Sequence, residues 1–388
     1  RVAITFPAEV SIVVEKFEEV RKRMTAQTMR SASGSQFEHQ MSVGAYLLKV
    51  NMPGHDSITY PFYLNYGTEW TCEAPNEQGK NRVLPIPELG EVTPGSCYVP
   101  EGWFYAGGDP DAPNGLDEMR VWADGFMMSE TPITHSQYLE FINDLVIRDG
   151  KNEANLWLPR EQSRSENEAG RPLYQWVEDH FEHSDGTKAL DLPVTNVTWF
   201  CALAYTQWLS EKTGKPWRMP LELEWEKAAR GVDRRRFPWG EQFDSAFCTM
   251  MDSHVGEPQI KPVHENVFDT SVYGIKSMAG NTREWCLDLF QADHYAVKDQ
   301  TLLIPSQDEL EASGFRSSRG GSYGNAASRT RSADRDWWFP HLAYVGRGFR
   351  IARSWPESDS SRELEENLKK AFETAIQKRR LRFSSLTD

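Results

Sequence analysis

The chain has 388 residues, and its 39% apolar and 12% aromatic content can build a core, which excludes a wholly disordered polypeptide. Acidic residues outnumber basic ones by 57 to 43, and the net charge of -14 repels phosphate backbones, so we expect no binding to nucleic acid. No stretch approaches the roughly 20 consecutive apolar residues that cross a bilayer, so we expect no membrane span.

The cysteines and the N-terminus bear on the cellular context. The five cysteines are odd in number, widely spaced and without a CxxC pair, which predicts free thiols in a reducing cytoplasm rather than a disulfide framework. The chain begins at Arg1 without the apolar segment of a signal peptide. Because it also lacks an initiating methionine, we expect a processed product or part of a longer protein with an upstream domain.

The first hundred residues are predicted to hold two units. Residues 8–30 mix apolar and charged side chains at helical spacing, which predicts that residues 1–35 form a helix followed by a linker at SASGSQ. From Gly44 onward, the segments GAYLLKV, NMPGHD and ITYPFYLNYG are typical of a strand, a turn and a second strand. Residues 36–96 are therefore predicted to form a small all-β module, which resembles the PEGA domains.

Three helices are predicted in the central part of the chain. Thr134 and Gln137 have the spacing of a capping box, which predicts a helix that begins after Thr134. A second apolar stripe follows Pro193 and ends at Gly214, a residue suited to the left-handed conformation after a helix. A third helix is predicted over residues 221–230.

Beyond Phe237 the helical period disappears, and the chain becomes rich in turns and aromatic residues. This change predicts an α+β fold with a loop-rich core. The last segment, residues 356–388, is predicted to be an amphipathic helix because Leu364, Leu368 and Phe372 fall on one face. Docking of this helix on its own protein is favoured over docking on a partner.

Four segments occur in an order and spacing typical of one family: WRMPLELEWEKAARG with FPWG, YGIKSMAGNTREW, RGGSY and GRGFRIAR. Together they resemble the formylglycine-generating enzyme, or sulfatase-modifying factor, family. The resemblance implies a C-type-lectin-like fold of the sulfatase-modifying-factor type over residues 97–355, preceded here by the β-module. Because buried charges need partners, we expect Arg218 or Arg350 to pair with Glu226 or Glu284.

The catalytic members of that family carry two cysteines just after the GGSY segment, and these bind copper(I) as soft thiolates. Matching this sequence on residues 320–323 puts the two positions at Asn325 and Thr330, neither of which is a thiol. The resemblance therefore implies a branch that lacks the copper site. We expect no copper and assign no catalytic residue.

Two further metal sites are considered. Family members bind a structural calcium in the segment that matches Ser277, Gly280, Thr282 and Glu284, whose oxygen atoms would suit a hard cation, so one structural calcium is predicted. Related sulfoxide synthases hold iron with three histidines from a preceding helical domain, where this chain has a β-module. The one local histidine cluster with ligand-like spacing is HFEH at residues 180–183.

The segment between GGSY and GFR, residues 324–345, would line the groove and upper surface where ligands bind in that fold. It contains a dense run of aromatic and charged residues, a composition typical of binding hot spots. Trp337, Trp338 and Phe339 cannot all point inward from an extended chain, so a surface role is weighed equally with a core role. The predicted ligand-binding residues are Tyr323, Asn325, Ser328, Thr330, Asp334, Asp336, Trp337, Trp338, Phe339, His341 and Tyr344.

The leading hypothesis is a non-catalytic recognition protein that presents residues 324–345 to a protein or small-molecule ligand. The arrangement is similar to the variable proteins of diversity-generating retroelements, which bind ligands through a region that ends near a GFR-type motif. Two alternatives stay open. One is an oxygenase-like enzyme that uses non-haem iron, and the other is a sensory or output module of a bacterial Ser/Thr kinase or effector encoded upstream of Arg1.

Overall fold

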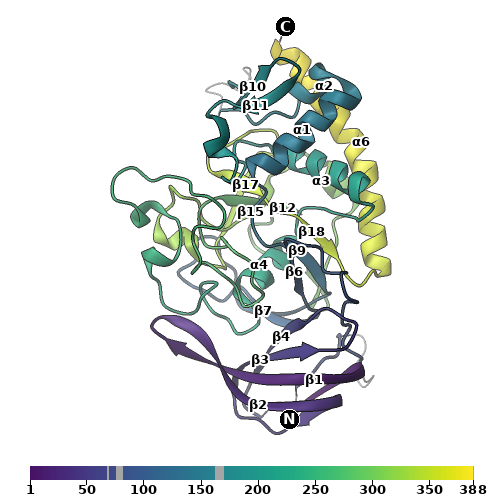
Figure 1. Cartoon of the computed structure of the whole chain (residues 1–388), viewed down its shortest axis with the longest axis vertical. Helices are drawn as coiled ribbons and strands as arrows, with labels where there is room; N and C mark the ends of the chain where they lie inside the picture. The colour runs from purple at the N-terminus through teal and green to yellow at the C-terminus, as the bar shows by residue number, and fades with distance from the viewer. Residues whose placement is uncertain (68–69, 76–81, 162–169, 388) are drawn as a thin grey trace.

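The computed structural model describes residues 1–67, 70–75, 82–161 and 170–387. Figure 1 shows an elongated molecule with an N-terminal sheet at one end and the helices α1, α2 and α6 toward the other. Short strands and long connections lie between them, which is the loop-rich α+β architecture expected from the sequence. Within these described ranges, no helix has both the length and the apolar composition that a bilayer crossing requires.

The N-terminal part forms an antiparallel sheet with the strand order β2-β1-β3-β4, and β5 pairs in parallel with β1. Its strands are β1 (Val2–Val20), β2 (Arg23–His39), β3 (Gly44–Asn51), β4 (Ile58–Leu64) and β5 (Trp70–Thr71). The predicted strands on either side of the NMPGHD turn are confirmed, since Val50 pairs with Ile58 across it. Residues 68–69 and 76–81 of the predicted module lie outside the described residues.

The predicted N-terminal helix and linker are wrong. Residues 2–39 form the β1–β2 hairpin, and the segment SASGSQ lies within β2. The apolar residues of this segment also fit a period of two, since Val10, Ile12 and Val14 are buried in the core of the sheet. Pairing of β1 with β3 selects that period, so the β-unit begins near the start of the chain rather than at residue 36.

The tip of the hairpin contacts the rest of the protein. Met24 donates its backbone N–H to the carbonyl oxygen of Trp239 at 2.7 Å, and the Lys22 ammonium lies 3.0 Å from the Asp244 carboxylate. The apolar core of the sheet also includes Tyr98 and Trp122, which belong to the following domain. The N-terminal sheet is therefore packed against the main domain at both places.

The predicted ends of the main helices are confirmed. Thr134 is the N-cap of α1, and it forms the capping box with Gln137. Gly214, with φ of 68°, follows the last residue of α3, and Gly231, with φ of 71°, follows the last residue of α4. The helices are α1 (His135–Asp149), α2 (Lys151–Asn155), α3 (Trp199–Thr213), α4 (Glu222–Arg230), α5 (Gln307–Glu311) and α6 (Asp359–Thr387).

The strands of the main domain are short and form small sheets joined by long connections. The sheets have the orders β16-β15-β12-β17, β13-β14-β8-β7, β18-β9-β6 and β10-β11. The strands are β6 (Ser96–Val99), β7 (Gly102–Ala106), β8 (Met119–Ala123), β9 (Phe126–Ser129), β10 (Tyr174–Val177), β11 (His180–His183), β12 (Arg283–Leu289), β13 (Val297–Lys298), β14 (Thr301–Leu302), β15 (Arg316–Arg319), β16 (Arg335–Trp338), β17 (Arg347–Phe349) and β18 (Ala352–Ser354). Single 3₁₀ turns lie at Gly186–Ala189, Ser245–Phe247, Met251–Ser253 and Ala327–Thr330.

The sheet β16-β15-β12-β17 brings several arginines side by side. Arg283 of β12 pairs in parallel register with Arg347 of β17, and Arg319 of β15 pairs with Arg335 of β16. Glu284 stands opposite Arg319 in the same sheet. Because buried guanidinium groups require carboxylate partners, this register determines which charges meet behind the candidate site.

The C-terminal helix α6 packs along one side of the main domain, where Figure 1 draws it in yellow. Leu364, Ala371 and Ala375 are buried in the same apolar cluster as residues of α3, and Leu368 and Phe372 pack at its margin. The predicted amphipathic helix is therefore confirmed, and it docks on its own protein.

Candidate functional site

A groove of about 350 Å³ opens where β12, β16 and β17 meet the loop that follows β15. Its walls combine aromatic rings with guanidinium groups and side-chain amides. The lining residues are Asn114, Arg283, Ser322, Asn325, Arg329, Asp336, Trp337, Trp338, Tyr344, Val345, Gly346 and Arg347.

The groove brings together some of the predicted ligand-binding residues and leaves out others. Asn325, Asp336, Trp337, Trp338 and Tyr344 line it. The predicted residues outside the lining are Tyr323, Ser328, Thr330, Asp334, Phe339 and His341. The run of residues 324–345 therefore contributes to the groove through separate short stretches rather than along its whole length.

Two of the residues outside the lining are buried beneath the loop. The Asp334 carboxylate accepts hydrogen bonds from Nη2 of Arg283 at 2.6 Å and from Nη1 of Arg329 at 3.2 Å. The Thr330 hydroxyl donates to the carbonyl oxygen of Ala327 at 2.7 Å. These contacts shape the groove from below, and neither side chain faces it.

Trp337 and Trp338 of β16, and Phe339 directly after it, point in alternating directions. Trp337 and Phe339 contact the ring of Phe315, with centroid distances of 4.1 and 4.7 Å, whereas Trp338 contacts Tyr344 at 4.9 Å. All three rings are half-buried. The expectation that they could not all point inward is confirmed.

Three arginines of the groove, Arg283, Arg329 and Arg347, were not among the predicted site residues. Nη2 of Arg347 donates to the Asp336 carboxylate at 2.7 Å, and Nε of Arg283 lies 3.6 Å from the same carboxylate. Their motifs, NTREW and GRGFR, do not by themselves distinguish a groove arginine from a scaffold arginine. The parallel pairing of β12 with β17 is what places both guanidinium groups at Asp336.

The charge of Arg347 is incompletely compensated. Burial lowers the pKa of Arg347 to about 9; the charge of Asp336 opposes this shift, and the like charge of Arg283 adds to it. The guanidinium lies 4.9 Å from the ring of Trp285 and 5.4 Å from that of Trp338. Aromatic faces stabilise this cation, but they accept no conventional hydrogen bond from its remaining N–H groups.

Four buried donor atoms of lining residues have no hydrogen-bond acceptor among the described residues. They are Nη1 of Arg283, Nε and Nη1 of Arg347, and Nε1 of Trp338. A buried donor without an acceptor costs about 1–3 kcal/mol, so such a cluster calls for an explanation.

Behind the groove, α4 and the central sheet form a network of buried ion pairs. Glu226 accepts hydrogen bonds from Arg319 and from Nη1 of Arg230, the latter at 2.9 Å. Nε of Arg335 donates to Glu222 at 2.7 Å. This network positions β15 and β16, and hence the floor of the groove, relative to α4.

One of the expected charge pairs is confirmed and the other is different. Nη2 of Arg350 donates to Glu284 at 2.8 Å, as expected. Arg218 instead pairs with Glu224, with Nη1 2.6 Å from Oε2. The reason is local, since Glu224 lies in the first turn of α4 and its carboxylate also accepts the backbone N–H of Leu221.

The predicted calcium ligands lie at the start of β12 and in the segment just before it, but their contacts do not fit a divalent cation. The buried Glu284 carboxylate already accepts hydrogen bonds from Arg350 and, at 2.7 Å, from Nε1 of Trp225. Because Arg350 neutralises this carboxylate, the remaining predicted ligands offer only uncharged oxygen atoms, a poor donor set for Ca²⁺. The predicted ligands are Ser277, Gly280, Thr282 and Glu284.

The two positions that match the copper cysteines of the family hold no soft ligand. The Asn325 side-chain oxygen accepts the backbone N–H of Ser322 at 3.0 Å, and Thr330 is fully buried. All five cysteines are free thiols, as predicted. Copper(I) requires thiolate or similarly soft ligands, so the residues present do not fit that metal.

The HFEH segment does not gather its histidines. It forms β11, where His180 contacts Asp179 and Glu182 at the surface, at 3.1 Å each. His183 is buried, and its ring lies 4.5 Å from that of His135. Over the described part of the chain, no three His, Cys, Asp or Glu side chains are placed to hold a metal ion together.

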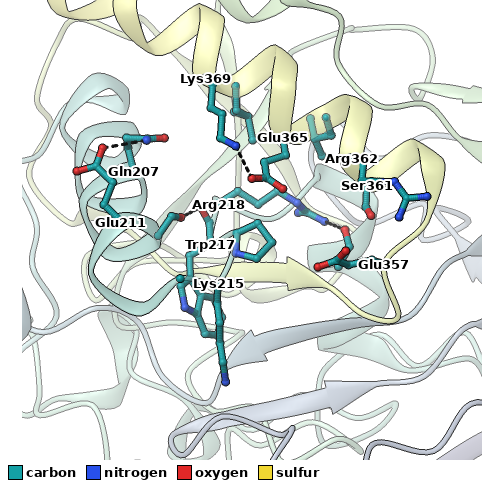
Figure 2. Close-up of a pocket in the computed structure, with 16 residues that line it drawn as sticks. Gln207, Glu211, Lys215, Trp217, Arg218, Glu357, Ser361, Arg362, Glu365 and Lys369 are labelled. Carbon is teal, nitrogen blue, oxygen red and sulfur yellow. Dashed lines mark hydrogen bonds and ion pairs between the residues drawn. The ribbon is translucent and has the colours of Figure 1, made fainter.

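A second cavity, of about 410 Å³, lies between α3, β18 and α6, and Figure 2 shows its walls. Two of its charged side chains have polar partners within the wall: Nη2 of Arg218 donates to Ser354 at 3.0 Å, and Lys369 pairs with Glu365 at 2.7 Å. This cavity shows none of the unpartnered donors found in the groove, so the groove is the stronger candidate site.

The fold and the groove together define a loop-rich α+β domain that presents a ligand-sized groove beside the strand of the GFR motif. The chain matches the Sulfatase-modifying factor enzyme 1-like domain over residues 85–355, and it belongs to that family.

Several curated relatives share this domain. A hercynine oxygenase of Mycolicibacterium smegmatis is 30% identical over 69% of this chain and 64% of its own length. A formylglycine-generating enzyme of Thermomonospora curvata is 27% identical over 69% of this chain and 96% of its own. The serine/threonine-protein kinase Pkn1 of Chlamydia trachomatis is 27% identical over 71% of this chain and 40% of its own. The chain thus spans less than two thirds of the oxygenase and of the kinase.

Among solved structures, PvdO from Pseudomonas aeruginosa is 22% identical to this chain and has a TM-score of 0.49. The similarity covers 67% of this chain and 94% of PvdO.

Proposed function

We propose that this protein is a recognition protein that binds a ligand in the groove, and that the groove carries out no oxygenation chemistry. One observation supports this most directly. The groove is built from aromatic rings and arginines, and Asn325 occupies the position of a family cysteine. Rings and guanidinium groups bind ligands by stacking, charge and hydrogen bonding.

The chemical state of Cys286, the cysteine nearest in sequence to the GGSY segment, supports the same proposal. Cys286 is fully buried, and burial, followed by the negative charge of Asp288, raises the pKa of its thiol well above the usual value. A protonated buried thiol neither binds copper(I) nor acts as a nucleophile. No cysteine or histidine lines the groove.

Because one relative is a hercynine oxygenase, the alternative function is an iron-dependent oxygenase. Measuring the metal content of the protein distinguishes this enzyme from a recognition protein. We expect the purified chain to contain substoichiometric copper and iron after incubation with either metal. Stoichiometric binding of one of them, lost on substitution of a groove residue, would contradict the proposal.

Ligand screening tests the recognition function itself. We expect an NMR screen of a small-molecule library to find ligands that bind the wild type and not the Val345→Trp variant. Val345 lines the groove and is 47% exposed at its rim, so a tryptophan there would fill the ligand's place. Ile147→Trp is the matched control, because Ile147 is 85% exposed on α1, outside the groove. The proposal would be overturned if no compound in the library loses its binding in the Val345→Trp variant.

The biological context is a separate part of the proposal. The chlamydial kinase shares this domain over 40% of its length, which favours a link to a kinase or effector domain. Sequencing the gene upstream of the Arg1 codon tests this link, and a kinase domain in the same reading frame is the supporting result. A near-copy of the region for residues 319–353 beside a reverse transcriptase, differing at adenines, would support a retroelement variable protein instead.

A further inference from the structure

We infer that the ligand of the groove carries an oxyanion, a carboxylate foremost, that is held by Arg283, Arg347 and the indole N–H of Trp338; this inference rests on the proposed function. It starts from the unpartnered polar atoms of the lining, which are N–H donors without exception. A group made only of acceptors complements them. A carboxylate has two acceptor oxygen atoms and no donor, so it can accept hydrogen bonds from several of these N–H groups at once.

The charge balance of the groove points to the same chemistry. Arg283, Arg329 and Arg347 contribute three positive charges, whereas Asp334 and Asp336 contribute two negative ones. A bound anion completes the pairing of a partly buried set of charges, which a neutral ligand cannot do. Burial is the largest cause of the lowered pKa of Arg347, and the like charge of Arg283 adds to it.

The contacts around Asp336 leave donors available for a second anion. This single carboxylate is shared by Arg283, at 3.6 Å, and Arg347, at 2.7 Å. It uses Nη2 of Arg347 and leaves Nε and Nη1 of the same guanidinium without partners. Charge-assisted hydrogen bonds from arginine to a carboxylate are about twice as strong as neutral ones, so a ligand carboxylate gains from these donors.

The aromatic walls describe the remainder of the ligand. A groove of about 350 Å³ is at the lower end of the range for small-molecule sites, and the rings of Trp337 and Trp338 line it. The Tyr344 ring, 37% exposed, lies 5.6 Å from the guanidinium of Arg347 and 4.9 Å from the ring of Trp338. An aromatic or apolar stem attached to the anion stacks on these rings.

A charge-matched ligand pair tests the inference. Phenylacetate and the neutral phenylacetamide have nearly the same shape, and each is titrated by NMR against the full chain at low salt. We expect phenylacetate to bind at least tenfold more tightly. Competition by inorganic phosphate distinguishes a carboxylate site from a phosphate site. If phosphate competes more weakly than phenylacetate, the result supports a carboxylate; if it competes more strongly, the carboxylate assignment is overturned.

Charge variants at the rim add a test that does not depend on core packing. We expect Val345→Lys to raise and Val345→Glu to lower the ratio of phenylacetate affinity to phenylacetamide affinity, each by roughly three- to tenfold at low ionic strength. Ile147→Lys and Ile147→Glu are the matched controls and should change neither ligand.

The outcomes separate this inference from the proposed function. Equal binding of both ligands, with equal affinities in the two Val345 variants, overturns the oxyanion assignment and leaves a recognition groove. A groove that binds neither these ligands nor any member of the library overturns both.

Discussion

The buried ion-pair network gives the sharpest stability prediction, which concerns Glu226→Gln. The Glu226 carboxylate is fully buried and accepts hydrogen bonds from Arg319, from Arg230 at 2.9 Å and from the backbone N–H of Gly107 at 2.7 Å. Glutamine keeps the shape and one acceptor oxygen. It removes the negative charge, however, and turns an NH₂ group toward guanidinium donors.

The magnitude follows from the partners that remain. Removing one member of a buried ion pair costs about 3–5 kcal/mol of unfolding free energy. Glu222, 3.7 Å from Arg319, still compensates part of the charge, so we expect the lower end, about 3 kcal/mol. A loss of that size is a large fraction of the roughly 5–15 kcal/mol that stabilises a typical native domain.

The assay is urea unfolding followed by tryptophan fluorescence, with Glu365→Gln as the matched control. Glu365 pairs with Lys369 at 2.7 Å, but the two side chains are 37% and 60% exposed, so its replacement should cost less than about 1 kcal/mol. A Glu226 variant that loses no more stability than the Glu365 variant would refute the reasoning that this network is a buried, charge-dependent scaffold.

Three further predictions concern pH, the terminal helix and calcium. Burial, and then the charge of Glu222, raises the pKa of Asp288 from 3.8 to about 7. Between pH 4 and pH 7 the folded state therefore keeps a proton that the unfolded state has lost, and the free energy of unfolding falls as the pH rises through that window. Asp288→Asn should therefore be more stable relative to the wild type at pH 8 than at pH 5, by roughly 2–3 kcal/mol in urea unfolding, and an equal difference at both pH values would contradict the assignment. Leu364→Ala should cost about 2–4 kcal/mol because Leu364 is 2% exposed between α6 and α3, and a thermal melt indistinguishable from wild type would mean that α6 does not dock. Calcium at millimolar concentration should leave the melting temperature unchanged relative to EGTA, because Arg350 neutralises Glu284; a clear calcium-dependent rise would restore the calcium prediction.

Helix ends were predictable because they depend on local chemistry. The capping pair of Thr134 with Gln137, and the glycines Gly214 and Gly231 with positive φ, need only a few neighbouring residues to act. The N-terminal hairpin was mispredicted because its apolar residues satisfy two periods at once. Only pairing across a long separation, such as Val14 with Leu48, decides between those periods.

The site was predictable in part for a similar reason. The aromatic run at 337–339 is visible in the composition alone, and its half-burial follows from strand alternation. The groove arginines are not visible in this way. Arg350 is satisfied by Glu284, whereas Arg347, three residues earlier, keeps unpartnered donors, and only the register of β12 with β17 makes that difference.

The contact between the hairpin tip and the main domain has a consequence for synthesis of the protein. Lys22 and Asp244 are 222 residues apart in sequence. At about 5–20 residues per second, a ribosome needs roughly ten to forty-five seconds to make the second partner after the first. During that interval the tip of the β1–β2 hairpin lacks this contact, and β2, an edge strand of its sheet, can pair with other nascent chains. Chaperone occupancy of this hairpin during translation should therefore fall sharply once the segment around residue 244 has emerged.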